Sequence, residues 1–323
     1  MRQLRLYQSS VEAAQPKSSA SIMPMLTYLD EEQVRSLLTW DELIPATERA
    51  LADYSTGKVM QPVRTVLPIE ESKRYLGIMP AVAKDVMGLK AVTFYPVNAG
   101  TGVATHQAMI LLFRAETGDP LAVMDGRLIT EMRTAAASAA VTSRLASPDA
   151  HILALLGSGV QANAHLEALR CIRHFNEVRV WSRNPEHARR FAQEQGVAAT
   201  DAESAVRGAD VIVTATGARD PILRGAWLKP GAHVNAVGSC HPNYRELDDE
   251  AMANILVVDS RDAAMQEAGD ILMSKARIYA EVGEIFAGIN PAPVAETTIF
   301  KSVGIAAEDL AAAKLVLNRI SIN

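Results

Sequence analysis

The sequence predicts an α/β protein that combines a doubly wound parallel sheet with a smaller α+β domain. Two observations support this fold class. From about residue 150 onward, continuous apolar runs alternate with helical stretches, which is typical of parallel strands buried on both faces and joined by crossover helices. Between residues 25 and 140, apolar runs follow one another directly with turn residues between them, as in a second sheet.

Composition sets the broad class of protein. The 323 residues suffice for two domains, and 49% hydrophobic with 21% charged residues is ordinary for a globular enzyme. A net charge of −5 argues against a nucleic-acid surface, and no apolar run is long enough to span a membrane. The two cysteines, Cys171 and Cys240, predict neither disulfides nor a metal site, which favours a reducing, cytoplasmic compartment.

The first block begins after a Ser-rich leader, residues 1–24, in which Glu12 is the one acid. This composition is compatible with a transit peptide, but we favour a disordered leader, with folded sequence from Met25. DEEQVRSLL predicts a helix capped by Asp30 or Thr27. Strands are expected at YLGIMPAV, at LKAVTFYPV, at HQAMILLF and, after the turn signal ETGDP, at PLAVMDG.

The second block follows an Ala-rich helix over residues 133–146. Its apolar runs predict strands over residues 151–157, 177–182, 210–216, 232–238 and 254–260. The amphipathic tail, residues 305–320, has no strand partner and is expected to return to the first domain. We therefore predict a substrate-binding and dimerisation domain from residues 25–140 with 300–323, and a cofactor domain from residues 141–299.

The loop LLGSGVQANA opens a helix directly after the first strand of this block. Gly157, Gly159 and Ala162 occupy the three positions of the G-x-G-x-x-G/A fingerprint. The first glycine permits a tight turn, the second lets the backbone approach a pyrophosphate, and the third small residue lets the helix pack closely on the sheet. Because the helix N-terminus also favours anions, the loop predicts a Rossmann-type dinucleotide site rather than a merely structural turn.

The end of the next strand predicts which dinucleotide binds. Sites for NAD place an acid there to hold the ribose 2′-hydroxyl, but this chain has Ser182, Arg183 and Asn184. Arg183 can pair with a 2′-phosphate, with help from its two polar neighbours. The alternative is an ordinary surface arginine. The missing acid favours NADPH or NADP as the cofactor.

Basic residues interrupt apolar stretches of the first block. They are Arg64 in MQPVRTVLP, Lys90 in GLKAVTF and Arg133 in EMRTAAAS. A buried charge needs an anionic partner, and a substrate carboxylate could serve all three. The alternative is that they are surface residues whose stems lie along apolar surface. His106 in ATHQAMI is a candidate too, although a satisfied core histidine explains it as well.

Several of these stretches together resemble the ornithine cyclodeaminase/mu-crystallin family, and in particular its ketimine reductases. The similarity runs from Met25 to about Leu317 and rests on MQPVRTVLP, YLGIMPA, LKAVTFY, THQAMILLF, LAVMDG, RTAAASA, LLGSGVQA, KPGAHVNAVGS, YRELDDE and IFKSVGIAAEDLAAAKL. The resemblance implies a homodimeric, NADPH-dependent reductase of cyclic ketimine carboxylates such as piperideine-2-carboxylate, pyrroline-2-carboxylate or sulfur analogues. It leaves open three alternatives: an alanine-type amino-acid dehydrogenase, an ornithine cyclodeaminase, and a thyroid-hormone-binding or crystallin-like binding protein.

The resemblance also implies roles for individual residues. Arg64 would bind the substrate carboxylate, Lys90 would lie beside the substrate as the first choice of proton donor, and Arg133 would lie between substrate and cofactor. Glu267 would lie near the substrate, and His106 would face the nicotinamide; both are catalytic candidates, as the runners-up to Lys90 for proton transfer. Residues implied to line the cofactor are Thr105, His106, Arg133, Gly157, Ser158, Gly159, Val160, Gln161, Ser182, Arg183, Asn184, Thr216, Gly217, Val237, Lys301 and Ser302.

Cys240 marks a departure from part of the family. The resemblance implies an aspartate at this point in cyclodeaminases and in archaeal alanine dehydrogenases, where a carboxylate can take a proton from an amine. A neutral thiol does this poorly, so Cys240 is expected to touch the substrate without acting as base or nucleophile; simple packing is the alternative. This departure and the missing acid at Ser182 both favour the reductase.

Overall fold

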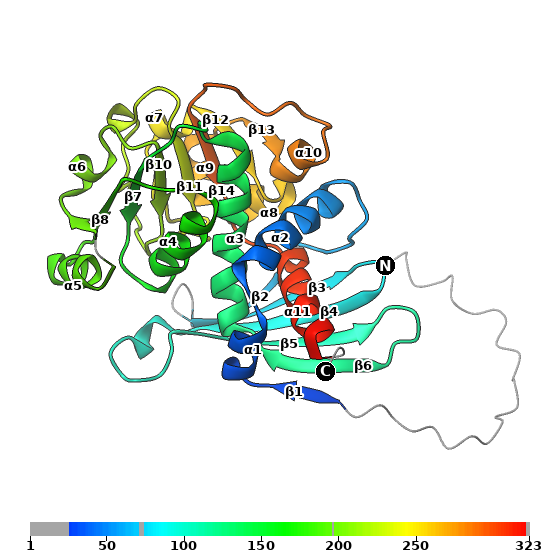
Figure 1. The fold of residues 1–323 in the computed structure, drawn as a ribbon. Coiled ribbons are helices and arrows are strands. Elements are labelled where there is room, and N and C mark those ends of the chain that lie inside the picture. The colour runs from blue at the N-terminus through cyan, green and yellow to red at the C-terminus, as the bar shows by residue number, and fades with distance from the viewer. Residues whose placement is uncertain (1–25, 71–73, 196, 321–323) are drawn as a thin grey trace, which may run out of the picture.

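The computed structural model describes residues 26–70, 74–195 and 197–320, and its strands form two separate sheets (Figure 1). The leader predicted over residues 1–24 lies outside the described residues. One sheet has six strands and the other has eight. The predicted fold class, a parallel α/β sheet with a smaller α+β unit, is confirmed. None of the described helices is both long and apolar enough to cross a membrane.

The six-stranded sheet is mixed. Its order is β1-β6-β5-β4-β3-β2; β1 runs parallel to β6 and the remaining neighbours are antiparallel. The strands are β1 (Thr27–Leu29), β2 (Thr65–Glu70), β3 (Arg74–Val82), β4 (Val86–Phe94), β5 (His106–Arg114) and β6 (Pro120–Asp125). The associated helices are α1 (Glu31–Leu37), α2 (Trp40–Ser55), α3 (Arg127–Leu145) and α11 (Ala306–Ile320), with a short 3-10 turn, η1 (Pro96–Asn98).

Helices cover one face of this sheet (Figure 1). Burial alternates along β3, β4 and β5, as the two-residue period of a strand requires. Met79, Val92 and Ile110 on the helix side are buried in the same cluster as α11. Asp30 caps α1 through a capping box with Gln33, so the N-cap of this helix is Asp30 and not Thr27.

The eight-stranded sheet is parallel throughout. Its order is β13-β12-β14-β11-β10-β7-β8-β9. The strands are β7 (Ile152–Leu156), β8 (Glu177–Trp181), β9 (Ala198–Ala199), β10 (Val211–Thr214), β11 (His233–Ala236), β12 (Ile255–Val258), β13 (Ile278–Glu281) and β14 (Thr298–Lys301). Its helices are α4 (Val160–Ile172), α5 (Pro185–Gln195), α6 (Ala202–Val206), α7 (Asp249–Met252), α8 (Arg261–Glu267), α9 (Gly269–Ser274) and α10 (Val282–Phe286), with a 3-10 turn, η2 (Gly225–Trp227).

The strand order reverses between β7 and β10, because β8 and β9 lie on one side of β7 while β10 and β11 lie on the other. Open α/β sheets bind ligands in the crevice beyond the carboxyl ends of the strands at such a point. The loops that follow β7, β10 and β11 all meet there. Together with the first turn of α4, they carry half of the residues for which we predicted a cofactor role.

Strand β14 lies between β11 and β12 and was not predicted. The expected domain boundary at residue 300 therefore falls inside a strand of the parallel sheet, and the chain leaves this sheet only after Lys301. It then forms α11, which packs against β3, β4 and β5 of the other sheet. The tail thus returns to the first block, although the division into two functional domains stays a prediction.

Candidate functional site

The glycine loop has the geometry that a dinucleotide needs. Gly157 adopts φ +133°, and a Cβ there would lie 2.6 Å from the carbonyl oxygen of Ala215, so the tight turn requires glycine. Gly159 is the N-cap of α4, and a Cβ added to it would meet nothing within 4 Å, so space lies open before the helix N-terminus. Ala162 is buried in the first turn of α4. These features fit a bound pyrophosphate.

Other residues predicted around this loop differ in exposure. Val160 is exposed, Ser158 and Gln161 are half-buried, and the carbonyl of Gln161 accepts a hydrogen bond from the ring of buried His165. At the end of β8, Arg183 is exposed and forms no hydrogen bond or ion pair within the part of the chain that the structure describes. Its guanidinium is therefore available to an external anion.

The loops after β10 and β11 are joined by a buried carboxylate that the sequence analysis missed. Glu246 accepts hydrogen bonds from Thr214 Oγ1 at 2.8 Å, from the Thr216 amide at 2.7 Å and from the Gly238 amide at 2.9 Å. A Cβ on Gly238 would lie 2.2 Å from the Thr216 amide nitrogen. The loops that carry Thr216, Gly217 and Val237 are therefore held in place by hydrogen bonds within the protein.

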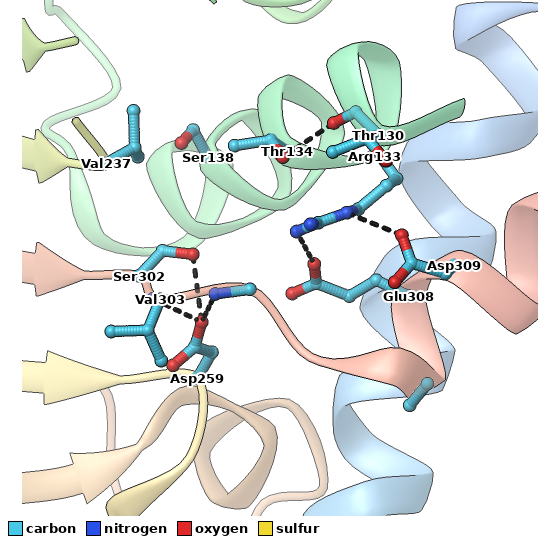
Figure 2. Close-up of polar contacts among 12 residues, drawn as sticks. Thr130, Arg133, Thr134, Ser138, Val237, Asp259, Ser302, Val303, Glu308 and Asp309 are labelled. Carbon is cyan, nitrogen blue, oxygen red and sulfur yellow. Dashed lines mark hydrogen bonds and ion pairs between the residues drawn. The ribbon is translucent and has the colours of Figure 1, made fainter. Parts of the chain in front are cut away.

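Lys301 and Ser302 end β14, and protein groups occupy their polar atoms. The ammonium of Lys301 lies 3.0 Å from Asp270 and donates to the Ser239 carbonyl at 2.6 Å, with neither charged side chain exposed. Ser302 Oγ donates to buried Asp259 at 2.9 Å (Figure 2). The predicted cofactor role of these two residues stays a prediction, and their side-chain contacts favour a structural one.

Two of the predicted basic residues meet in a buried charge cluster. Lys90 on β4 lies 2.9 Å from Asp309 Oδ1, and Arg133 Nε on α3 lies 2.9 Å from the same oxygen. Arg133 also donates to Glu308 at 2.6 Å, and Figure 2 shows its guanidinium between the two carboxylates. At most 5% of any of these four side chains is exposed. The sequence analysis missed both acids.

Burial governs the electrostatics of this cluster. It lowers the pKa of Lys90 to about 8, with a further contribution from Arg133, while Asp309 acts in the opposite direction. Burial would raise the pKa of Asp309, but Lys90 and Arg133 outweigh it and hold that pKa below its ordinary value. Burial raises the pKa of Glu308 to about 7. Near neutral pH, Asp309 is therefore ionised and Lys90 is close to its titration range.

His106, at the start of β5, is neutral at physiological pH. Burial lowers its pKa to about 4, and the positive charges of Lys90 and Arg133 lower it further. A neutral imidazole can accept or donate a hydrogen bond, but it is a poor source of protons. Thr105, directly before it, is half-buried, and its carbonyl accepts from the Tyr95 amide at 2.7 Å.

Arg64 lies just before β2 and contacts the turn that follows β14. Its Nε is 2.9 Å from Glu267, and its Nη2 donates to the carbonyls of Val303 and, at 2.7 Å, Gly304. A Cβ on Gly304 would lie 2.5 Å from Arg133 Nη1, so the two arginines flank one turn. The lining of a small adjacent cavity includes Gln61, Val63, Arg64, Met79, Ile305 and Ala306.

Glu267, Tyr75 and Cys240 surround Arg64. Burial raises the pKa of Glu267 against the opposing effect of Arg64, and its buried Oε2 has no hydrogen-bond partner among the residues that the structure describes. Burial raises the pKa of Tyr75, a residue that we did not predict, to about 12. Burial also raises the pKa of the Cys240 thiol, although Lys301 and Arg64 act in the opposite direction. The Cys240 residue still reaches solvent, and its raised pKa keeps the thiol neutral.

Fold and site together define a two-sheet protein with a Rossmann-type dinucleotide loop and a neighbouring cluster of basic residues. The model of the ornithine cyclodeaminase/mu-crystallin family matches residues 25–323, and the chain belongs to this family. Ketimine reductase mu-crystallin of Mus musculus is 50% identical over 299 residues, which cover 90% of this chain and 96% of the mouse protein.

Solved structures agree with this assignment. The Delta(1)-pyrroline-2-carboxylate reductase of Thermococcus litoralis, solved with NADH and L-proline, superposes with a TM-score of 0.87 and 34% identity, covering 92% of this chain and 98% of its own. An archaeal alanine dehydrogenase dimer with bound NAD gives a TM-score of 0.86 and 35% identity, covering 92% and 97% of the two chains. Both structures therefore share the overall fold over 92% of this chain.

Proposed function

We propose that the protein reduces cyclic ketimine carboxylates to cyclic amino acids with NADPH. The observation that carries this proposal is the convergence of Arg64, Lys90 and Arg133 on one turn and one charge cluster, in a chain that also has a complete dinucleotide loop. The names of the mouse, Thermococcus and archaeal relatives support chemistry at a carbon–nitrogen bond. Piperideine-2-carboxylate and pyrroline-2-carboxylate are the first candidate substrates.

Each basic residue then has a role that its position permits. Arg64 binds the substrate carboxylate through its planar fork, in exchange for its contact with Glu267, and Arg133 assists from α3. Lys90 donates a proton to the imine nitrogen or holds it protonated, because its pKa of about 8 suits proton transfer near neutral pH. NADPH, when bound, supplies the hydride to the carbon of the C=N bond. Glu267 is the second candidate for proton transfer.

The preference for NADPH over NADH rests on Arg183. Its exposed guanidinium has no partner among the described residues, and no acid stands at Trp181–Asn184 to bind a ribose 2′-hydroxyl. The Thermococcus and archaeal structures contain NADH and NAD, so the shared property of these relatives is dinucleotide binding in general. The 2′-phosphate is our assignment for this chain.

A homodimer is supported by the six-stranded sheet. Its face opposite the helices carries apolar residues that are only half-buried, and the edge strand β2 exposes Val66, Leu67 and Ile69. Contiguous apolar surface of this kind marks an interaction site in soluble proteins. The archaeal relative of known structure is described as a dimer. We further propose a cytoplasmic location, in keeping with two free cysteines.

The deciding experiment follows NADPH oxidation with piperideine- and pyrroline-2-carboxylate. Turnover that requires a cyclic imine and prefers NADPH would support the proposal and rank the two ring sizes. Reductive amination of pyruvate with ammonia and NADH would instead indicate the dehydrogenase, and release of ammonia from ornithine without added NADPH would indicate a cyclodeaminase. Tight NADPH binding without turnover of either imine would contradict the proposal and leave a binding protein.

A further inference from the structure

One carboxylate from the C-terminal helix lies between two basic residues of the site. Asp309, near the start of α11, has Oδ1 at 2.9 Å from both Lys90 Nζ and Arg133 Nε, and Oδ2 at 2.8 Å from Lys90 Nζ. Only 1% of the Asp309 side chain is exposed. The three residues come from β4, α3 and α11, so this contact joins elements that are far apart in the sequence.

The two cations do not depend on Asp309 equally. Arg133 has Glu308 as a second partner at 2.6 Å (Figure 2). Lys90 has no partner other than Asp309 within residues 26–70, 74–195 and 197–320. A buried ammonium whose one carboxylate is removed either loses its proton or becomes strongly unfavourable. The state of Lys90 should therefore depend on Asp309 more than on Glu308.

We propose that Asp309 is a positioning residue, which holds the Lys90 ammonium in its charged form at a fixed separation from the Arg133 guanidinium. This inference rests on the proposed function, because Lys90 is there the proton donor to the imine nitrogen. The charged and titratable groups near Lys90 are Asp309 and Glu308 on α11, Arg133 on α3, His106 on β5, and Arg64 before β2. Among them, Asp309 is the anion in direct contact with the ammonium.

The test compares the pH dependence of kcat in the wild type and in Asp309→Asn. Without the carboxylate, Lys90 should lose its proton at lower pH, so the alkaline limb of the profile should move down by about one to three pH units. Asp309→Glu, which restores a carboxylate, should recover most of the alkaline activity. NADPH affinity should change less than kcat, because Arg133, the one predicted cofactor residue that Asp309 contacts, keeps Glu308 as its partner. A uniform fall in kcat with an unmoved alkaline limb would overturn the proposal.

Asp85→Asn is the matched control. Asp85 forms a surface ion pair with Lys314 of the same helix α11, so this variant makes the same chemical change and weakens the same helix without touching Lys90. Its alkaline limb should coincide with that of the wild type. If it moved as far as that of Asp309→Asn, the effect would come from anchoring the helix, and the proposal would be wrong.

A second measurement separates this proposal from the proposed function. NMR titration of selectively ¹³Cε-labelled lysine follows the Lys90 ammonium directly, without any turnover. Earlier deprotonation of Lys90 in Asp309→Asn supports the positioning role even if no imine is reduced, and an unchanged titration refutes it even if imines are reduced. If Asp309→Asn does not fold, the variant Lys90→Gln/Asp309→Asn should fold, because it removes both buried charges together. Failure of that double variant to fold would count against the pairing.

Discussion

Replacing Arg183 by serine should change the cofactor preference without changing stability. The side chain is exposed and has no partner in the described part of the chain, so the folded protein loses no contact. A hydrogen bond to a charged group contributes about 1.5–3 kcal/mol. Because the site is solvent-exposed and screened, we expect the lower end, which corresponds to roughly a tenfold weaker affinity for NADPH. Affinity for NADH, which lacks the 2′-phosphate, should stay unchanged.

The assay is a pair of steady-state titrations with one cyclic imine, in which kcat/KM for NADPH is divided by kcat/KM for NADH. Arg190→Ser is the control, because Arg190 is also an exposed arginine but lies within α5, away from the end of β8. Only the Arg183 variant should lower the ratio, and added salt should narrow the difference. If Arg183→Ser left the ratio unchanged, or weakened both cofactors equally, the assignment of the 2′-phosphate to Arg183 would be refuted.

Further predictions concern other parts of the site. Lys90→Ala should lower kcat far more than NADPH affinity, and a near-normal kcat in this variant would exclude Lys90 as the proton donor. In the wild type, kcat should fall as pH rises through about 8, because Lys90 then loses its proton. Gly157→Ala should reduce both stability and cofactor binding, whereas Gly159→Ala should reduce only cofactor binding, as thermal melts with and without NADPH would reveal. Lys301→Met leaves buried Asp270 unpaired and should destabilise the protein by about 3–5 kcal/mol in denaturant titrations.

Local patterns were sufficient to predict most of the fold. Continuous apolar runs such as ILALL are buried on both faces of the parallel sheet, and their short length and the glycine that follows favour a strand over a buried helix. Strand β14 was missed because TIFK is short and ends in a lysine, which looks like a surface residue. Only the tertiary partner, Asp270, explains why Lys301 is fully buried there.

In the candidate site, too, local patterns predict some residues, whereas others depend on tertiary contacts. The glycine loop was predictable because each glycine answers a local backbone requirement, such as φ +133° at Gly157. The basic residues Arg64, Lys90 and Arg133 could be selected because they interrupt apolar stretches. Glu308 and Asp309 could not be selected in this way, and only the family resemblance indicated Glu267, since all three acids lie more than 170 residues further along the chain from the cations that they contact.

Glu308 and Asp309 also explain why such partners escape a local argument. Acidic residues in the first turn of a helix are favoured by the helix dipole, and α11 has both there. Because the helix dipole alone explains both acidic residues, the sequence gives no reason to look for distant partners of Glu308 and Asp309. Yet both side chains are almost fully buried, and an exposed pair would satisfy the dipole equally well. Their burial follows instead from the two cations on β4 and α3, which could not remain charged inside the protein without them. The C-terminal helix therefore contributes charge to the site as well as packing to the first sheet.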